Sequence, residues 1–197
     1  MKTKWIVLIV VALVVIIGYS TFKGSYNGMV QGEESISGAW AQVENQYQRR
    51  SDLIPNLVNT VKGYADFEQE TLTGVIEARA KATSVSIDPG NLSPEAIAKF
   101  EQAQQGVSSS LSRLLVTVER YPDLKASTQF SQLQVQLEGT ENRISVERRN
   151  FNTAVQGYNT FIKTFPKNLI AGMFGFEQKG YFEANPGSDV APEVTFD

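Results

Sequence analysis

The chain contains no cysteine and no histidine among its 197 residues. The absence of cysteine excludes disulfides, thiol nucleophiles, thiolate metal sites and the acylated cysteine of a lipoprotein. The absence of histidine removes the commonest general base and metal ligand. The formal net charge of −3 also lacks the basic excess that is typical of nucleic-acid binding. We therefore expect no enzymatic activity, no cofactor and no nucleic-acid partner.

One long apolar run is present, and its centre, from Trp5 to Ile17, has no polar side chain. A helix over residues 5–22 would be about 27 Å long, close to the roughly 30 Å of a bilayer's hydrocarbon core. The alternative is a cleaved signal peptide, but Gly18-Tyr19-Ser20 is a poor cleavage site, so we favour a retained anchor. We predict a transmembrane anchor over residues 1–23. The residues assigned to it are Trp5, Ile6, Leu8, Val11, Leu13, Ile16, Ile17, Tyr19 and Phe22.

Basic residues near the anchor indicate its orientation. Lys2 and Lys4 precede the apolar run, and only Lys23 follows it closely. By the positive-inside rule, the amino end lies in the cytoplasm and the body lies outside a single-pass inner-membrane anchor. Residues 24–32 contain three glycines, so they form either a flexible neck or a helix weakened by about 1 kcal/mol at each glycine.

Residues 33–165 show the helical period, beginning with apolar residues at 36, 40, 43 and 47. Trp40 lies in this stripe, so we interpret it as a core residue. The run Arg49-Arg50-Ser51-Asp52 before Pro55 predicts a corner: the arginines favour a helix end, Asp52 caps the next helix, and proline suits its first turn. A contact of the two arginines with lipid headgroups is the weaker alternative.

Further corners complete the predicted bundle. The second helix continues to about Ala82, and Ser93-Pro94-Glu95 predicts the start of a third, which ends at Tyr121-Pro122. The longest helix follows, over residues 127–164. We therefore predict an all-α protein in which the membrane helix is followed by an antiparallel four-helix bundle.

The apolar seam of the last predicted helix becomes polar in its middle. Thr140 and Glu147 occupy seam positions, with Glu141 and Arg148 beside them. We favour a buried polar network that fixes the register of the helices. The alternative is a carboxylate-lined site for a metal or a small ligand, built on Glu141 and Glu147. The usual Glu-x-x-His motif of such sites is absent.

Aromatic and apolar residues are dense in the segment 166–183. We favour a lid that packs across one end of the bundle, and the alternative is contact with the membrane surface or with a partner chain. The residues that would make this contact are Leu169, Ile170, Met173, Phe174, Phe176, Tyr181 and Phe182. Residues 184–197 are rich in proline, glycine, serine and acid, which predicts a disordered tail.

Several stretches resemble the bacterial LemA family. They are Gln48-Arg49-Arg50, Asp52–Val58, Thr60–Ala65, Glu77–Ala80, Tyr121–Ala126, Leu137–Ile144, Tyr158-Asn159, Phe165-Pro166, Phe174–Phe176 and Tyr181–Glu183. The resemblance implies one amino-terminal transmembrane helix, an antiparallel four-helix bundle and no established enzymatic activity. Members of that family are often encoded near membrane-associated partners, such as a membrane zinc metalloprotease or small extracytoplasmic domains, and the resemblance therefore implies an accessory or adaptor role.

The absent catalytic residues, the anchor and the aromatic segment together favour a membrane-anchored scaffold or interaction protein. We expect it to associate with the lipid bilayer, with copies of itself and with a membrane-protein partner. The alternative from another class is the bundle that binds a metal or small ligand at Glu141 and Glu147.

Overall fold

The computed structural model describes residues 2–63 and 68–183, and within these residues the chain is helical with no strand. The helices are α1 (Lys2–Lys62), α2 (Gln69–Thr83), α3 (Pro94–Val118), α4 (Pro122–Lys125), α5 (Thr128–Lys163) and α6 (Lys167–Phe174). The tail predicted over residues 184–197 lies outside the described residues. The predicted all-α class is therefore confirmed for the part of the chain that the structure describes.

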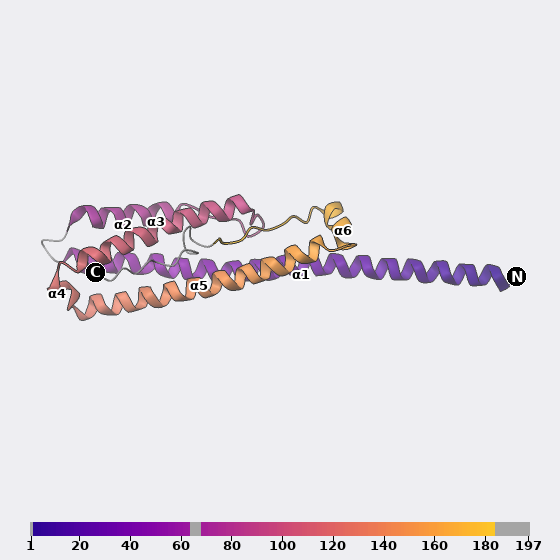
Figure 1. Ribbon diagram of the computed structural model, residues 1–197, viewed down its shortest axis with the longest axis horizontal. Helices are drawn as coiled ribbons and strands as arrows, with labels where there is room; N and C mark the ends of the chain where they lie inside the picture. The colour runs from indigo at the N-terminus through magenta and orange to yellow at the C-terminus, as the bar shows by residue number, and fades with distance from the viewer. Residues whose placement is uncertain (1, 64–67, 184–197) are drawn as a thin grey trace, which may run out of the picture.

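Helix α1 contains 61 residues and at about 1.5 Å per residue is about 90 Å long. Its amino-terminal part extends alone beyond the rest of the molecule (Figure 1). The side chains there are exposed on every face, from Trp5 at 66% to Phe22 at 37%. This part of α1 is long and apolar enough to cross a membrane.

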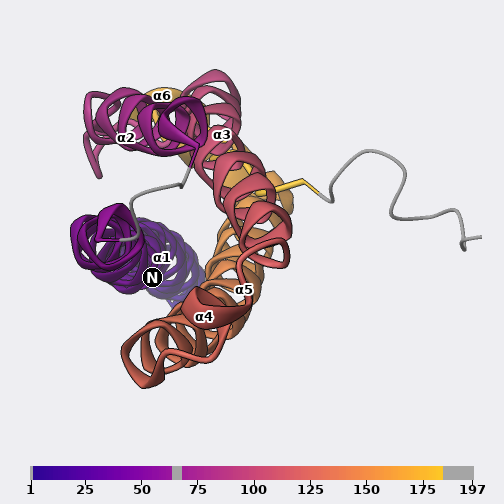
Figure 2. The same ribbon diagram turned by 90° about the vertical axis from the view of Figure 1, so that its left-hand side faces the viewer.

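The remaining helices lie beside the carboxyl-terminal part of α1. Helix α5 follows α1 along most of the body, and α2 pairs with α3 on the other side (Figures 1 and 2). Helix α6 packs against both α1 and α5, close to the point where α1 leaves the body. The short α4 joins α3 to α5 at the opposite end (Figure 1).

The corner predicted at residues 51–55 is wrong, because α1 continues through Pro55 to Lys62. A proline inside a helix has no N–H to donate to the carbonyl four residues earlier, here that of Ser51. Arg79 on α2 replaces the missing donor, since its Nε donates to the Ser51 carbonyl at 2.8 Å. The helix therefore keeps its buried carbonyl satisfied and does not need to end.

The three glycines of the predicted neck lie in unbroken helix, and two of them, Gly28 and Gly32, allow α5 to approach α1 closely. A Cβ added at Gly28 would stand 2.5 Å from Cζ of Phe161, and one at Gly32 would stand 2.8 Å from Cδ2 of Tyr158. Both distances are too short for real Cβ contacts. Of the two alternatives, the structure shows the helix, and the missing side chains make room for two aromatic rings.

The starts of α3 and α5 agree with the sequence: Ser93 is the predicted cap of α3, and α5 begins next to the predicted Ser127, which the structure shows to be a cap as well. The Ser93 hydroxyl accepts from the backbone N–H of Ala96 at 3.2 Å, with Pro94 as the first helical residue. The Ser127 hydroxyl accepts from the N–H of Phe130 at 3.4 Å. Each cap satisfies one of the donors that a helix start leaves without an internal partner.

The core divides into two hydrophobic clusters along the length of the body. The anchor-proximal cluster includes Trp40, Phe100 and Phe151. The distal cluster includes Leu57 and Leu114. Buried polar side chains lie between the two clusters, and they form the candidate site.

Candidate functional site

Arg50 occupies the boundary between the two clusters, and its side chain is only 2% exposed. Its α1 neighbours one turn away are Tyr47, in the anchor-proximal cluster, and Ile54, in the distal one. The buried stripe of α1 continues at spacings of 3 and 4 through positions 36, 40, 43, 47, 50, 54, 57 and 61. An arginine at one of these inward positions is the signal in the sequence that a polar layer crosses the core.

The Arg50 guanidinium is bound from two other helices. Its Nη1 donates to the Ser108 hydroxyl at 2.8 Å and to the two carboxylate oxygens of Glu141 at 3.0 and 3.3 Å. Its Nη2 donates to the Gln104 carbonyl at 3.1 Å and to Gln104 Oε1 at 2.7 Å. The Tyr47 ring lies beneath it, 5.0 Å from ring centroid to Cζ. A buried charge needs such pairing to be tolerated.

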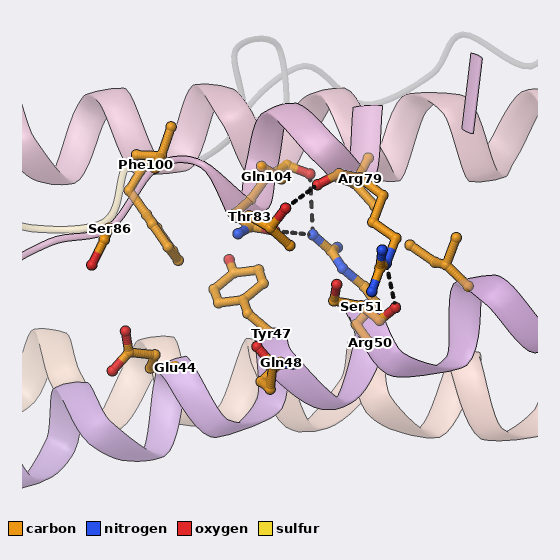
Figure 3. Close-up of a pocket in the computed structure, with 14 residues that line it drawn as sticks. Glu44, Tyr47, Gln48, Arg50, Ser51, Arg79, Thr83, Ser86, Phe100 and Gln104 are labelled. Carbon is orange, nitrogen blue, oxygen red and sulfur yellow. Dashed lines mark hydrogen bonds between the residues drawn. The ribbon is translucent and has the colours of Figure 1, made fainter. Parts of the chain in front are cut away.

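A cavity of about 150 Å³ adjoins this polar layer, between α1, α2 and α3. Figure 3 shows Tyr47, Arg50 and Ser51 approaching it from α1, with Arg79 from α2 and Gln104 from α3. The exposed side chains at its rim are Glu44, Gln48, Thr83 and Ser86. Its apolar wall consists of Ile54, Ala82, Val85, Phe100 and Val107.

Several inner polar groups of this cavity are hydrogen-bond donors that lack a partner. The hydroxyl of Ser51 is buried and has no hydrogen-bond partner within the described residues. Arg79 uses its Nε for the Ser51 carbonyl, and within residues 2–63 and 68–183 its two Nη groups make no further bond. Burial raises the pKa of the Tyr47 phenol above its usual 10.0, so Tyr47 stays protonated and remains a donor.

Glu141 and Glu147, the residues of the alternative carboxylate site, have separate partners. Glu141 binds Arg50, whereas Glu147 accepts from Nδ2 of Asn150 at 3.0 Å. Across residues 2–63 and 68–183, no three acidic side chains converge into a group that could hold a metal ion. Glu141 is thus one member of a polar network at the middle of α5, and Thr140 is buried beside it.

The predicted aromatic contact residues divide into buried and exposed ones. Ile170 and Phe182 are buried within the chain, and Phe176 is half-buried. Phe174 and Tyr181 are 49% and 42% exposed. Leu169 and Met173, both on α6, are the most exposed, at 58% and 74%.

The C-terminal segment, residues 175–183, lies along the body and is held by two asparagines of α5. Asn152 receives the N–H of Phe182 at 2.9 Å and donates to its carbonyl at 2.8 Å. Asn159 does the same for Lys179, at 3.0 and 2.9 Å. Each side-chain amide thereby binds both the N–H and the carbonyl of one residue, as a neighbouring strand would do in a sheet. Of the predicted lid over residues 166–183, α6 lies at the anchor-proximal end of the body, whereas residues 175–183 run along its side (Figure 1).

Phe182 is the apolar attachment point of the C-terminal segment. Its ring stacks on Trp40, with centroids 6.0 Å apart, and meets Phe151 edge-on at 5.3 Å. Arg148, which forms an ion pair with Glu101, lies over the other side of the ring at 4.7 Å. Trp40 is 0% exposed, so its predicted place in the core is confirmed.

Ser51 and Arg79 are the site residues that sequence reasoning missed. Ser51 was assigned to a corner, and Arg79 was not singled out. Both depend on Pro55, because the carbonyl it leaves free is what Arg79 binds. The signal in the sequence is that the apolar stripe continues past Pro55, which indicates an unbroken helix with a free carbonyl that needs a donor.

The comparisons with known proteins agree with the resemblance in the sequence. A model of the LemA family matches residues 39–196. "Protein LemA" of Metamycoplasma hominis is 25% identical over 182 residues, covering 92% of this chain and 80% of that protein. "Magnetosome protein MamQ 2" of Paramagnetospirillum magneticum is 24% identical over 210 residues, covering 95% and 75%. "Magnetosome protein MamQ" of Magnetospirillum gryphiswaldense is 25% identical, covering 89% and 72%.

The matched region contains the whole polar layer. Arg50, Arg79 and Glu141 lie in three of the stretches that carry the resemblance, at 48–50, 77–80 and 137–144, and the fold brings these stretches together. The family model also covers most of the body and the C-terminal segment. The chain belongs to the LemA family.

Proposed function

We propose that this protein is a membrane-anchored scaffold that acts by binding other molecules and not by catalysis. The observation that carries the proposal is the continuity of α1 from the exposed apolar part into the core of the body. A single helix joins the two without a hinge, so the body is held at a fixed position relative to the bilayer. The family membership, and relatives named after the magnetosome, fit a role at a membrane.

The anchor-proximal end is the proposed contact surface. Phe174 of α6 meets Phe22 and Tyr26 of α1 edge-on, with centroid distances of 5.7 and 5.1 Å. These contacts hold α6 beside the end of the apolar part of α1. Leu169 and Met173 are then exposed apolar side chains near the membrane surface. We propose that they contact a membrane-protein partner.

The finer features of the proposal concern assembly and location. The body is proposed to be an antiparallel four-helix bundle of α2, α3, α5 and the distal part of α1. The protein is proposed to associate with copies of itself while it is anchored in the membrane. Its place is proposed to be the inner membrane, with one crossing and the body on the extracytoplasmic side, because Lys2 and Lys4 precede the apolar run.

Partner recovery from native membranes tests the contact surface. We expect the full-length double variant Leu169→Ser/Met173→Ser to recover less of its partner than the wild type. The matched control is Val116→Ser/Val135→Ser, because these side chains are also apolar and exposed, at 71% and 66%, but lie outside α6. Equal recovery by both variants would exclude α6 as the contact. If the α6 variant stays in the membrane but no longer recovers its partner, a contact of α6 with lipid alone is excluded.

Crosslinking in the same membranes tests self-association. We expect crosslinked dimers or larger species of the wild type at native expression, and monomers alone would contradict self-association.

Thiol labelling tests the orientation of the body. Ser131→Cys introduces a single thiol at an exposed position of α5. We expect an impermeant thiol reagent to label it in intact cells. Protection until the cells are broken would reverse the orientation.

A further inference from the structure

The inner part of the cavity between α1, α2 and α3 presents hydrogen-bond donors that have no acceptor. Ser51 Oγ and the two Nη groups of Arg79 have no partner among residues 2–63 and 68–183. The Tyr47 hydroxyl points into the same space (Figure 3). The inner acceptors, the Gln104 carbonyl and side-chain oxygen and the Ser51 carbonyl, are already taken by arginine donors. The Glu44 carboxylate also lines the cavity, but it lies at the exposed rim, apart from Arg79 (Figure 3). An occupant that satisfies this cavity therefore has to bring acceptors of its own.

Charge decides which kind of acceptor fits. Arg50 is neutralised by Glu141 on the far side of the polar layer, with N and O 3.0 Å apart. Arg79 makes no ion pair with any described residue. Its guanidinium is half-buried and its direction is fixed by the Nε bond to the Ser51 carbonyl. A fixed planar fork of N–H groups is the geometry that binds a carboxylate with two parallel hydrogen bonds.

The size and wall of the cavity define the rest of the occupant. Ile54, Phe100 and Val107 form an apolar surface opposite the donors. The volume of about 150 Å³ matches that of an engineered apolar cavity known to hold benzene. An occupant of this size has a carboxylate at one end and a small apolar group at the other.

We propose that this cavity binds a small organic carboxylate, with Arg79 and Ser51 holding the carboxylate and Phe100 and Ile54 contacting its apolar part. Binding goes beyond the scaffold function, because the cavity lies away from α6 and from the anchor. It also couples α1 to α2 and α3, since each of these three helices lines the cavity. Occupancy would stabilise α2 against α1 at the position where Pro55 leaves the carbonyl of Ser51 to Arg79.

Benzoate and benzamide are the matched probes for the test, because they share a ring and differ in the negative charge. The full-length protein in lipid nanodiscs is titrated with each at constant ionic strength. The readout is the side-chain ¹⁵Nε resonance of Arg79. We expect saturable benzoate binding that is at least about tenfold tighter than benzamide binding, as for hydrogen bonds to a charged group. No saturable benzoate shift, or equal shifts with benzamide, would overturn the proposal.

Ser51→Ala is the decisive variant, because the hydroxyl it removes makes no hydrogen bond to any residue that the structure describes. We expect the variant to keep the wild-type melting temperature without ligand and to bind benzoate about fivefold more weakly or worse. Arg79→Gln lacks the Nε reporter, so its binding is followed by the rise in melting temperature with each probe, and this rise should no longer be larger for benzoate than for benzamide. Arg113→Gln, an exposed α3 position outside the cavity, controls for net charge and should bind as the wild type does. Wild-type benzoate affinity in Ser51→Ala would overturn the assignment.

Discussion

Arg50 and Glu141 are 91 positions apart in the sequence, and their side chains meet at 3.0 Å. The two ends of the pair differ in environment: the Arg50 side chain is 2% exposed and that of Glu141 is 50% exposed. The pair lies between two hydrophobic clusters, so a shift of α5 along α1 would place the guanidinium among apolar side chains. The cost of an unpaired buried charge therefore fixes the register of α1 against α5.

Breaking this pair should cost more from the buried end than from the exposed end. We expect Glu141→Gln to lower the free energy of unfolding by about 1.5 kcal/mol, near the lower limit for a charged hydrogen bond, because water can reach the site. We expect Arg50→Ala to lower it by about 3 kcal/mol or more, since the variant leaves Gln104 and Ser108 without their donor. Denaturant unfolding of the full chain in micelles measures both.

The double variant Arg50→Ala/Glu141→Gln should cost less than the sum of the single variants, by about 1 kcal/mol. The control is Glu138→Gln, one turn away on α5. Among the described residues Glu138 is bound only by exposed Gln134, so the variant should change stability by less than about 0.5 kcal/mol. Strict additivity would show that the pair does not couple the two helices.

Two glycines of α1 should respond to alanine in opposite directions. Gly28→Ala would place a Cβ 2.5 Å from Phe161, and we expect this overpacking to lower stability by about 1 kcal/mol or more. Gly38→Ala has nothing within 4 Å, so we expect it to raise stability by up to about 1 kcal/mol through helix propensity. Thermal unfolding of both variants is the measurement. A stabilised Gly28→Ala would show that Phe161 is free to move aside.

The C-terminal segment should detach when its side-chain amides are removed. Asn159 is 4% exposed and makes both bonds to Lys179. We expect Asn159→Ala to increase hydrogen exchange at the backbone N–H groups of Lys179 and Phe182 by about tenfold or more, because their local opening becomes easier. Asn150→Ala is the control, since within residues 2–63 and 68–183 its side chain binds only Glu147. Equal protection in both variants would mean that Phe182 alone holds the segment.

Tyr158 should make the protein less stable in alkali. Burial and the neighbouring Glu33 carboxylate raise the pKa of its phenol, which donates to Glu33 at 3.2 Å while Lys179 approaches the ring. The unfolded chain releases this proton near pH 10, but the folded chain keeps it. The stabilising effect is therefore complete below pH 10 and is lost as the pH rises above it. Chemical denaturation from pH 8 to 11.5 should show a shallower decline for Tyr158→Phe than for the wild type, and equal slopes would contradict this.

Local signals predicted several elements well. The cap at Ser93, the helix start near Ser127 and the stop at Pro122 depend on neighbouring residues only. They mark where α3 and α5 begin and where α3 gives way to α4. The prediction of a corner at Pro55 is wrong. The rule that proline ends a helix assumes that no other group donates to the carbonyl that proline leaves free. Arg79 does so from another helix, and nothing within a few residues of Pro55 announces it.

The candidate site was predictable only in outline. The polar middle of the last helix indicated a network, and the structure shows Glu141 within one. Its main member, Arg50, is predicted at a helix end, because a pair of arginines favours that position. The 3–4 spacing of the buried stripe, which places Arg50 in the core, is the signal that this prediction leaves out. The cavity itself was not predictable, because its lining comes from three helices whose register depends on packing.

The sequence by itself determined the long apolar run, the helical class and the absence of cysteine and histidine chemistry, because each depends on residue type and period alone. Only the tertiary structure decided that α1 passes Pro55 without ending and that Arg50 is buried. It also decided that aromatic rings of α5 pack against Gly28 and Gly32 of the predicted neck. The physical reason is the same in each case: a carbonyl, a backbone surface or a charge is satisfied by a group that is distant in the chain.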